Sequence, residues 1–114
     1  FISGTNNELK YYYKNVRLFV YPSRYEGFGI PMVESMRLGC PIISSDGGAL
    51  KEVGGDGISY FNPDDVEDIK FKLENYIYDD TKLNDSINYG YRQCKKYSWE
   101  KCTKETYDIY GNLF

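Results

Sequence analysis

Short apolar runs alternate with segments of helical periodicity along this chain. The runs at residues 17–21 and 41–44 are almost uninterrupted, and turn-forming Pro, Ser, Asp or Gly residues follow each of them. Uninterrupted apolar runs of this length are typical of strands buried on both faces, as in a parallel sheet. We therefore predict strands there, a weaker strand at residues 58–61 and the stub of another at residues 1–3.

Segments with apolar residues at helical spacing lie between and after these runs. Two acidic residues open one of them, which favours the helix dipole. Gly39 closes another, as glycine often does, and Ser98 is a favourable N-cap for the last. The run Tyr11-Tyr12-Tyr13 is assigned to helix packing. The predicted helices cover residues 7–15, 31–38, 49–53, 64–78, 82–95 and 99–112.

Strands that alternate with helices predict an α/β fold, here a Rossmann-like domain with three α/β/α layers around a small parallel sheet. The crossover between parallel strands of one sheet is right-handed. Ligands of such sheets bind beyond the carboxyl ends of the strands. The loops at residues 22–30 and 45–50 follow predicted strands, so they are the candidate site loops.

Charge and composition argue against several functions. The chain has 114 residues and a formal net charge of −3, and its Lys and Arg residues are spread among acids. Nucleic-acid binding favours a concentrated basic surface, so we expect no nucleic-acid partner. The chain contains no histidine, which removes His-based catalytic triads and the commonest metal ligand.

Cysteine usage and hydropathy indicate the cellular compartment of the protein. Cys40, Cys94 and Cys102 form no CxxC pair and give an odd count, which fits a reducing cytoplasm better than a disulfide framework. No apolar run approaches the roughly 20 residues that span a bilayer. We expect a cytoplasmic protein, with peripheral association at the inner face of the membrane as a further option.

The segment from Pro22 to Glu34 is the strongest candidate site. Gly27 and Gly29 allow positive φ angles and the close approach of a ligand. The amides at the start of the following helix form an anion site that suits a diphosphate. Glu26 before this turn and Glu34 one turn into the helix can accept hydrogen bonds from sugar hydroxyls. Alternatively, Glu34 only complements the helix N-terminus and Glu26 is a surface acid.

The spacing of Glu26-Gly-Phe-Gly-Ile-Pro and Glu34 resembles the E-x7-E motif of retaining GT-B-fold glycosyltransferases, the glycosyl transferases of group 1 or family four. The segments Pro41–Val53, Gly57–Asp64 and Tyr97–Glu100 are similar to later landmarks of that family. The resemblance extends in order over nearly the whole chain. It implies a Rossmann-like second domain of a GT-B fold, truncated, which binds a nucleotide sugar.

The resemblance also implies a role for each motif residue. Glu26 contacts the donor hexose and is the catalytic candidate, and Glu34 holds the ribose. The amides between them contact the hexose and the phosphates, from Gly27, Phe28, Gly29 and Ile30. The intact enzyme is expected to transfer a hexose from a nucleoside-diphosphate sugar to an acceptor hydroxyl with retention, without a metal or another cofactor. A sugar or lipid-linked acceptor would bind a domain outside this chain.

Further expectations concern the chain as a fragment. Residues 1–114 are expected to be one donor-binding fragment, with C-terminal helices over about 64–112. Phe1 in place of Met is consistent with an excised piece. The strand order of the family implies a parallel sheet with residues 41–44 in the middle and residues 1–3 outside it. The fragment alone is expected to be inactive and to self-associate through exposed apolar faces.

Two other functions stay open. A GT-B-fold sugar-nucleotide epimerase would not be expected to carry this glutamate spacing. A non-catalytic flavodoxin-like module would need an acidic cluster at early strand ends and a lysine late in the sheet. Several residues near the motif are assigned ordinary roles: Arg24 as a surface residue, Met32 and Met36 as core, Cys40 as a small buried residue, and Asp46 as a turn former.

Overall fold

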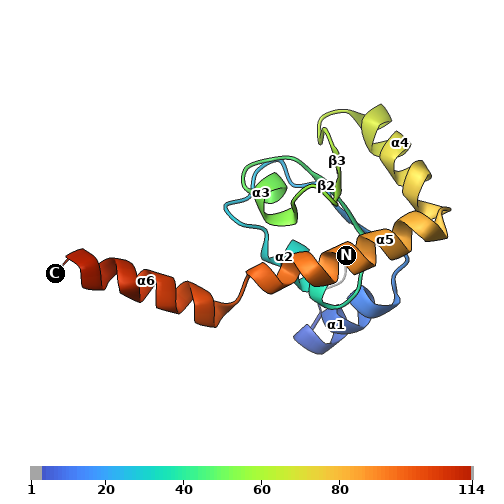
Figure 1. Cartoon of the computed structure of the whole chain (residues 1–114). Helices are drawn as coiled ribbons and strands as arrows, with labels where there is room; N and C mark the ends of the chain where they lie inside the picture. Colours follow the sequence, from blue (N-terminus) through green and yellow to red (C-terminus); the bar gives the residue numbers. More distant parts are fainter. Residues whose placement is uncertain (1–3, 114) are drawn as a thin grey trace.

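The computed structural model describes residues 4–113, and within them it has six α-helices and one three-stranded sheet (Figure 1). The strands are β1 (Phe19–Tyr21), β2 (Ile42–Ser45) and β3 (Ser59–Phe61). The helices are α1 (Asn6–Asn15), α2 (Ile30–Arg37), α3 (Leu50–Gly54), α4 (Val66–Ile77), α5 (Asp80–Gln93) and α6 (Trp99–Leu113), with a 3₁₀ turn η1 (Cys94–Lys96) after α5. These elements confirm the predicted ones with ends shifted by one or two residues. The predicted strand at residues 1–3 lies outside the described residues.

The sheet is parallel, and β2 is its central strand. Phe19 of β1 lies opposite Ile42, and Ile43 of β2 lies opposite Ser59 of β3. All four residues of β2 are buried, because strands and helices cover it on every side. The predicted order of the three strands is therefore confirmed. Helices α2 and α3 form the crossovers that parallel strands require.

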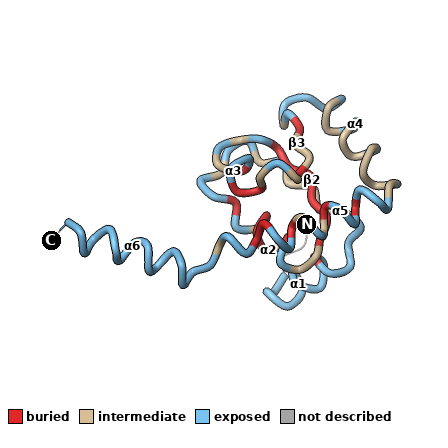
Figure 2. The backbone as a smooth tube through the Cα atoms, viewed as in Figure 1, coloured by how far each residue is buried: buried red, intermediate tan, exposed pale blue. Residues whose placement is uncertain are grey.

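The core lies between β2 and the helices α2 and α3 (Figure 2). Met32 and Met36 of α2 are 0% and 1% exposed, which confirms their predicted place in the core. Cys40 is buried as predicted. Helix α5 packs closely on α2 because Gly90 has no side chain, and an added Cβ there would lie 3.1 Å from Cγ of Met36. This packing gives α2 a rigid base.

The last helix, α6, projects from the body of the molecule (Figures 1 and 2). The Ser98 hydroxyl accepts a hydrogen bond from the Lys101 amide at 3.1 Å, which confirms the predicted N-cap. Every residue of α6 is exposed, and the Trp99 side chain is 77% exposed. The helix therefore presents apolar residues that no described part of the chain covers.

Candidate functional site

The two candidate loops lie side by side at the carboxyl ends of β1 and β2. The Ala49 amide donates a hydrogen bond to the Glu26 carbonyl at 3.0 Å, and the Ser45 hydroxyl donates one to the Ser23 carbonyl. Gly48 has a φ of +62°, and a Cβ added to it would lie 2.3 Å from the Glu26 carbonyl oxygen. The second loop thus approaches the first so closely that glycine is required there.

The fold requires glycine at position 29 but not at position 27. Gly29 has a φ of +93° at the N-cap of α2, and an added Cβ would lie 2.6 Å from Cδ2 of Leu50. The expectation of a positive φ is correct for Gly29 and wrong for Gly27. A Cβ added to Gly27 would meet no atom within 4 Å, so the fold itself does not require glycine at this position. The space beside the Gly27 backbone is open.

The start of α2 lies behind this turn without a side-chain cap from residues 4–113. Pro31 in its first turn has no amide proton to satisfy. An uncapped helix start and the positive end of the helix dipole attract anions.

Glu26 lies in the loop after β1 and is half-buried. The Tyr21 hydroxyl donates a hydrogen bond of 2.8 Å to Oε1 of Glu26. Burial raises the pKa of Tyr21, and the bond to Glu26 raises it further. The phenol therefore stays protonated at neutral pH and remains a donor to the carboxylate.

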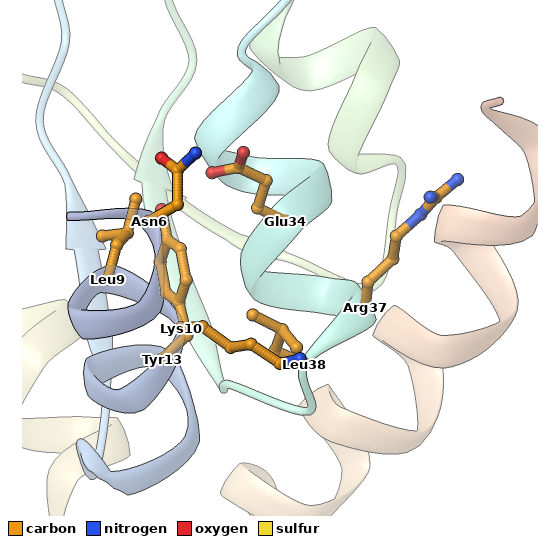
Figure 3. A pocket seen from close by; sticks show the side chains of 7 residues that line it. All are labelled: Asn6, Leu9, Lys10, Tyr13, Glu34, Arg37 and Leu38. Carbon is orange, nitrogen blue, oxygen red and sulfur yellow. The ribbon is translucent and has the colours of Figure 1, made fainter. Parts of the chain in front are cut away.

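Glu34 lies one turn into α2 and lines a pocket of about 350 Å³ between α1 and α2, together with Asn6, Leu9, Lys10, Tyr13, Arg37 and Leu38 (Figure 3). The polar ends of Asn6, Tyr13 and Glu34 lie toward the same end of this pocket, whereas Arg37 points away. Tyr13 is only 6% exposed. Burial raises the pKa of Tyr13 to about 12, and the negative charge of Glu34 contributes.

A larger groove of about 700 Å³ lies on the other side of Glu34, between α2 and the beginning of α6. Phe28 and Ile30 line it and are 41% and 48% exposed. The Phe28 ring packs edge-on against Tyr97 with centroids 5.3 Å apart. Glu34 therefore borders both the small pocket and the larger groove, and the Phe28 side chain lines the larger groove.

Arg24 and Asp46 lie at the edge of this site. Arg24 is a surface residue, as predicted, and its guanidinium forms an exposed ion pair of 2.7 Å with Asp64. Asp46 is exposed directly before the Gly47-Gly48 turn. No side-chain hydrogen bond or ion pair within residues 4–113 joins either residue to Glu26 or Glu34.

Tyr13 and Tyr21 belong to this site although the sequence pattern does not single them out. Within the run Tyr11-Tyr12-Tyr13, nothing local distinguishes the one tyrosine that is buried. Tyr21 ends β1 and lies five residues before Glu26. A polar aromatic residue at the carboxyl end of a predicted strand, beside the candidate loop, is the signal that would have identified it.

Residues 4–113 hold neither a candidate metal site nor a membrane-spanning helix. No cluster of three or more Cys, Asp or Glu side chains there is arranged to hold a metal ion. Among the same residues, no helix has the length and apolar character needed to cross a membrane.

A parallel α/β sheet with glycine-rich loops at its carboxyl edge defines a Rossmann-like ligand-binding domain. Residues 1–93 match the family described as glycosyl transferases group 1, and the chain belongs to that family. The solved structure of sucrose-phosphate synthase from Thermosynechococcus elongatus superimposes with a TM-score of 0.81 at 24% identity, over 90% of this chain and 27% of that one. The α/β fold is therefore that of a GT-B domain.

Several curated relatives are similar in sequence. O-antigen chain mannosyltransferase B of Escherichia coli is 39% identical over 95% of this chain and 28% of its own length. O-antigen chain mannosyltransferase RfbU of Salmonella typhimurium is 44% identical over 60% of this chain and 20% of its own length. MMP alpha-(1->4)-mannosyltransferase of Mycolicibacterium hassiacum is 36% identical over 78% of this chain and 23% of its own length. The chain thus spans less than a third of the length of these relatives.

Proposed function

We propose that the intact protein is a retaining glycosyltransferase and that this chain binds its donor, a nucleoside-diphosphate hexose. One observation carries the proposal. Two half-buried glutamates, Glu26 and Glu34, lie before and after a glycine turn that leads into an uncapped helix start. Membership of the glycosyl transferases group 1 family supports this interpretation of the turn.

The donor diphosphate binds at the start of α2. The amides of Gly27 to Ile30 and the helix dipole stabilise its negative charge. The open space beside Gly27 supports a close approach of the phosphates to the backbone, because the fold leaves room there that a side chain would fill.

The donor then extends in both directions from the phosphates. Glu26 precedes the turn and accepts hydrogen bonds from the hexose, whereas Glu34 follows it on α2 and accepts them from the ribose. A carboxylate has several acceptor sites and suits a vicinal diol. The chain therefore meets hexose, diphosphate and ribose in the order in which the donor presents them.

Catalysis rests on electrostatic preorganisation. The helix start stabilises the departing diphosphate, and Glu26 stabilises positive charge that develops at the reacting carbon of the hexose. No metal or other cofactor enters this scheme. The acceptor, a sugar or a lipid-linked sugar, binds a part of the protein outside this chain, so residues 1–114 alone do not turn over.

A screen of the full-length protein tests the proposal. Hydrolysis and transfer are measured with UDP-, GDP- and ADP-sugars, and the names of the relatives make mannose the first hexose to try. Proton NMR of the product is expected to show the anomeric configuration of the donor. Inversion would overturn the assignment of retention. Interconversion of the sugar nucleotide without transfer would instead support the epimerase.

A further inference from the structure

Three aromatic rings connect the surroundings of the two glutamates. Tyr13 of α1 packs edge-on against Phe19 of β1, with ring centroids 5.4 Å apart and planes at 80°. Phe19 stacks on Tyr21, with centroids 5.5 Å apart and planes at 24°. We call Tyr13, Phe19 and Tyr21 the aromatic cluster. It joins α1 to β1, the next element along the chain.

Each end of the aromatic cluster carries a phenol that faces a glutamate of the motif. The Tyr21 hydroxyl donates to Glu26 at 2.8 Å. The Tyr13 hydroxyl and the Glu34 carboxylate share one end of the small pocket between α1 and α2 (Figure 3). Tyr13 is buried, and Phe19 and Tyr21 are half-buried, so the rings have little freedom to reorient.

Ring packing alone does not account for two tyrosines. Phenylalanine at either position would supply the same apolar contact with Phe19, but it would leave the facing carboxylate without a phenol donor. A buried tyrosine hydroxyl normally has a polar partner. Here the polar side chains that face the two phenols include both glutamates that the proposed function assigns to the donor.

We propose that the aromatic cluster positions both carboxylates, with Tyr21 orienting Glu26 toward the hexose and Tyr13 orienting Glu34 toward the ribose. This inference rests on the proposed function. A glutamate side chain loses rotamer freedom when it binds a ligand. The Tyr21 hydroxyl, which already holds one oxygen of Glu26, reduces that loss, and the Tyr13 hydroxyl faces the Glu34 carboxylate in the small pocket. The second oxygen stays free for a sugar hydroxyl. Phe19 packs against both tyrosine rings.

The two tyrosines are expected to affect different steps in the full-length protein. Tyr13→Phe should weaken binding of the free nucleoside diphosphate, by calorimetry, about three- to tenfold, less than the loss of Glu34 itself, because Tyr13 acts only through that carboxylate. It should raise KM for the donor and leave kcat unchanged. Tyr21→Phe should lower kcat by a similar factor and leave free nucleotide affinity within about twofold.

Tyr12→Phe is the matched control. Tyr12 lies beside Tyr13 on the same helix, is 40% exposed, and packs on Tyr11 rather than on the aromatic cluster. The same loss of a hydroxyl there should change neither nucleotide affinity nor kcat. Thermal unfolding of all variants establishes that each is folded.

A double-mutant cycle separates positioning from general packing. If Tyr13 acts through Glu34, Tyr13→Phe should have no further effect on nucleotide affinity once Glu34→Ala is present. Additive effects, or a Tyr13→Phe variant with unchanged affinity beside a weakened Glu34→Ala variant, would overturn this inference alone. If Glu34→Ala itself binds the nucleotide normally, the proposed function fails and the inference fails with it.

Discussion

At the scale of single residues, Glu26 and Glu34 share a motif but have different surroundings. Glu26 lies in a loop that the backbone of Gly48 and Ala49 supports. Glu34 projects from a helix whose next two residues, Ser35 and Met36, are buried, and it borders two hollows. The two carboxylates can therefore contact different parts of one ligand.

Glu34→Ala in the intact protein is expected to weaken nucleotide binding roughly ten- to a hundredfold, because charge-assisted hydrogen bonds to a diol contribute about 1.5–3 kcal/mol. The free nucleoside diphosphate and the sugar donor should lose affinity equally, as measured by calorimetry. An unchanged affinity for the nucleotide would return Glu34 to the simpler role of complementing the helix N-terminus.

Glu26→Gln keeps the shape of the side chain and removes its charge. We expect kcat to fall about ten- to a hundredfold, with little change in free nucleotide affinity, because a group that touches only the hexose cannot help to bind a sugarless nucleotide. Steady-state kinetics and calorimetry check the two parts. A loss of nucleotide affinity as large as that of Glu34→Ala, with kcat intact, would contradict the assignment.

At the scale of elements, the site depends on how closely the two loops approach. Gly48 allows the second loop to contact the Glu26 carbonyl, while Gly29 allows the first to turn into α2 above Leu50. These glycines serve the fold. Gly27 serves no such purpose within it, and the proposed donor supplies the reason for its lack of a side chain.

Alanine substitutions distinguish these two kinds of glycine. Gly48→Ala should lower the free energy of unfolding by about 1–3 kcal/mol, because a Cβ there is both strained and obstructed. Gly27→Ala should leave that free energy within about 0.5 kcal/mol of its original value but weaken donor binding. Denaturant unfolding and calorimetry on the intact protein measure the two quantities. A large destabilisation by Gly27→Ala would remove the argument for phosphate at this position.

At the scale of the whole molecule, α6 leaves an apolar surface open. Trp99, Cys102 and Ile109 line the groove that faces Phe28 and Ile30. No described residue covers this surface, and apolar surface of this kind favours association. The exposed helix and the open groove therefore belong to one face of the chain.

Residues 1–114 expressed alone are expected to self-associate and to show no sugar transfer. Sedimentation at micromolar concentrations should detect dimers or larger species. Ile109→Glu should reduce them because Ile109 lines the groove. Thr103→Glu adds the same charge to α6 at a position outside the groove lining and is the control. A strictly monomeric chain would contradict the expectation of self-association.

The local sequence pattern was sufficient to predict the helices and strands and to select the two candidate glutamates. Apolar runs, helical spacing and turn residues act within a few neighbours, so they predicted α2 after β1 and two candidate glutamates with seven residues between them. The same pattern predicted that Met32 and Met36 would be buried. The expectation of a positive φ at Gly27 was wrong, because the φ angle of a loop glycine depends on the path of the whole loop.

Tertiary structure decided what lies around the motif. Tyr13 and Glu34 line one pocket only because α1 lies beside α2, and the Gly48 loop reaches Glu26 only because β2 pairs beside β1. Contacts between segments distant in sequence arise from the packing of the whole sheet and its helices, which no short window of residues encodes. The sequence by itself therefore determined which residues are candidates for the proposed donor site, and the fold decided which side chains lie around them.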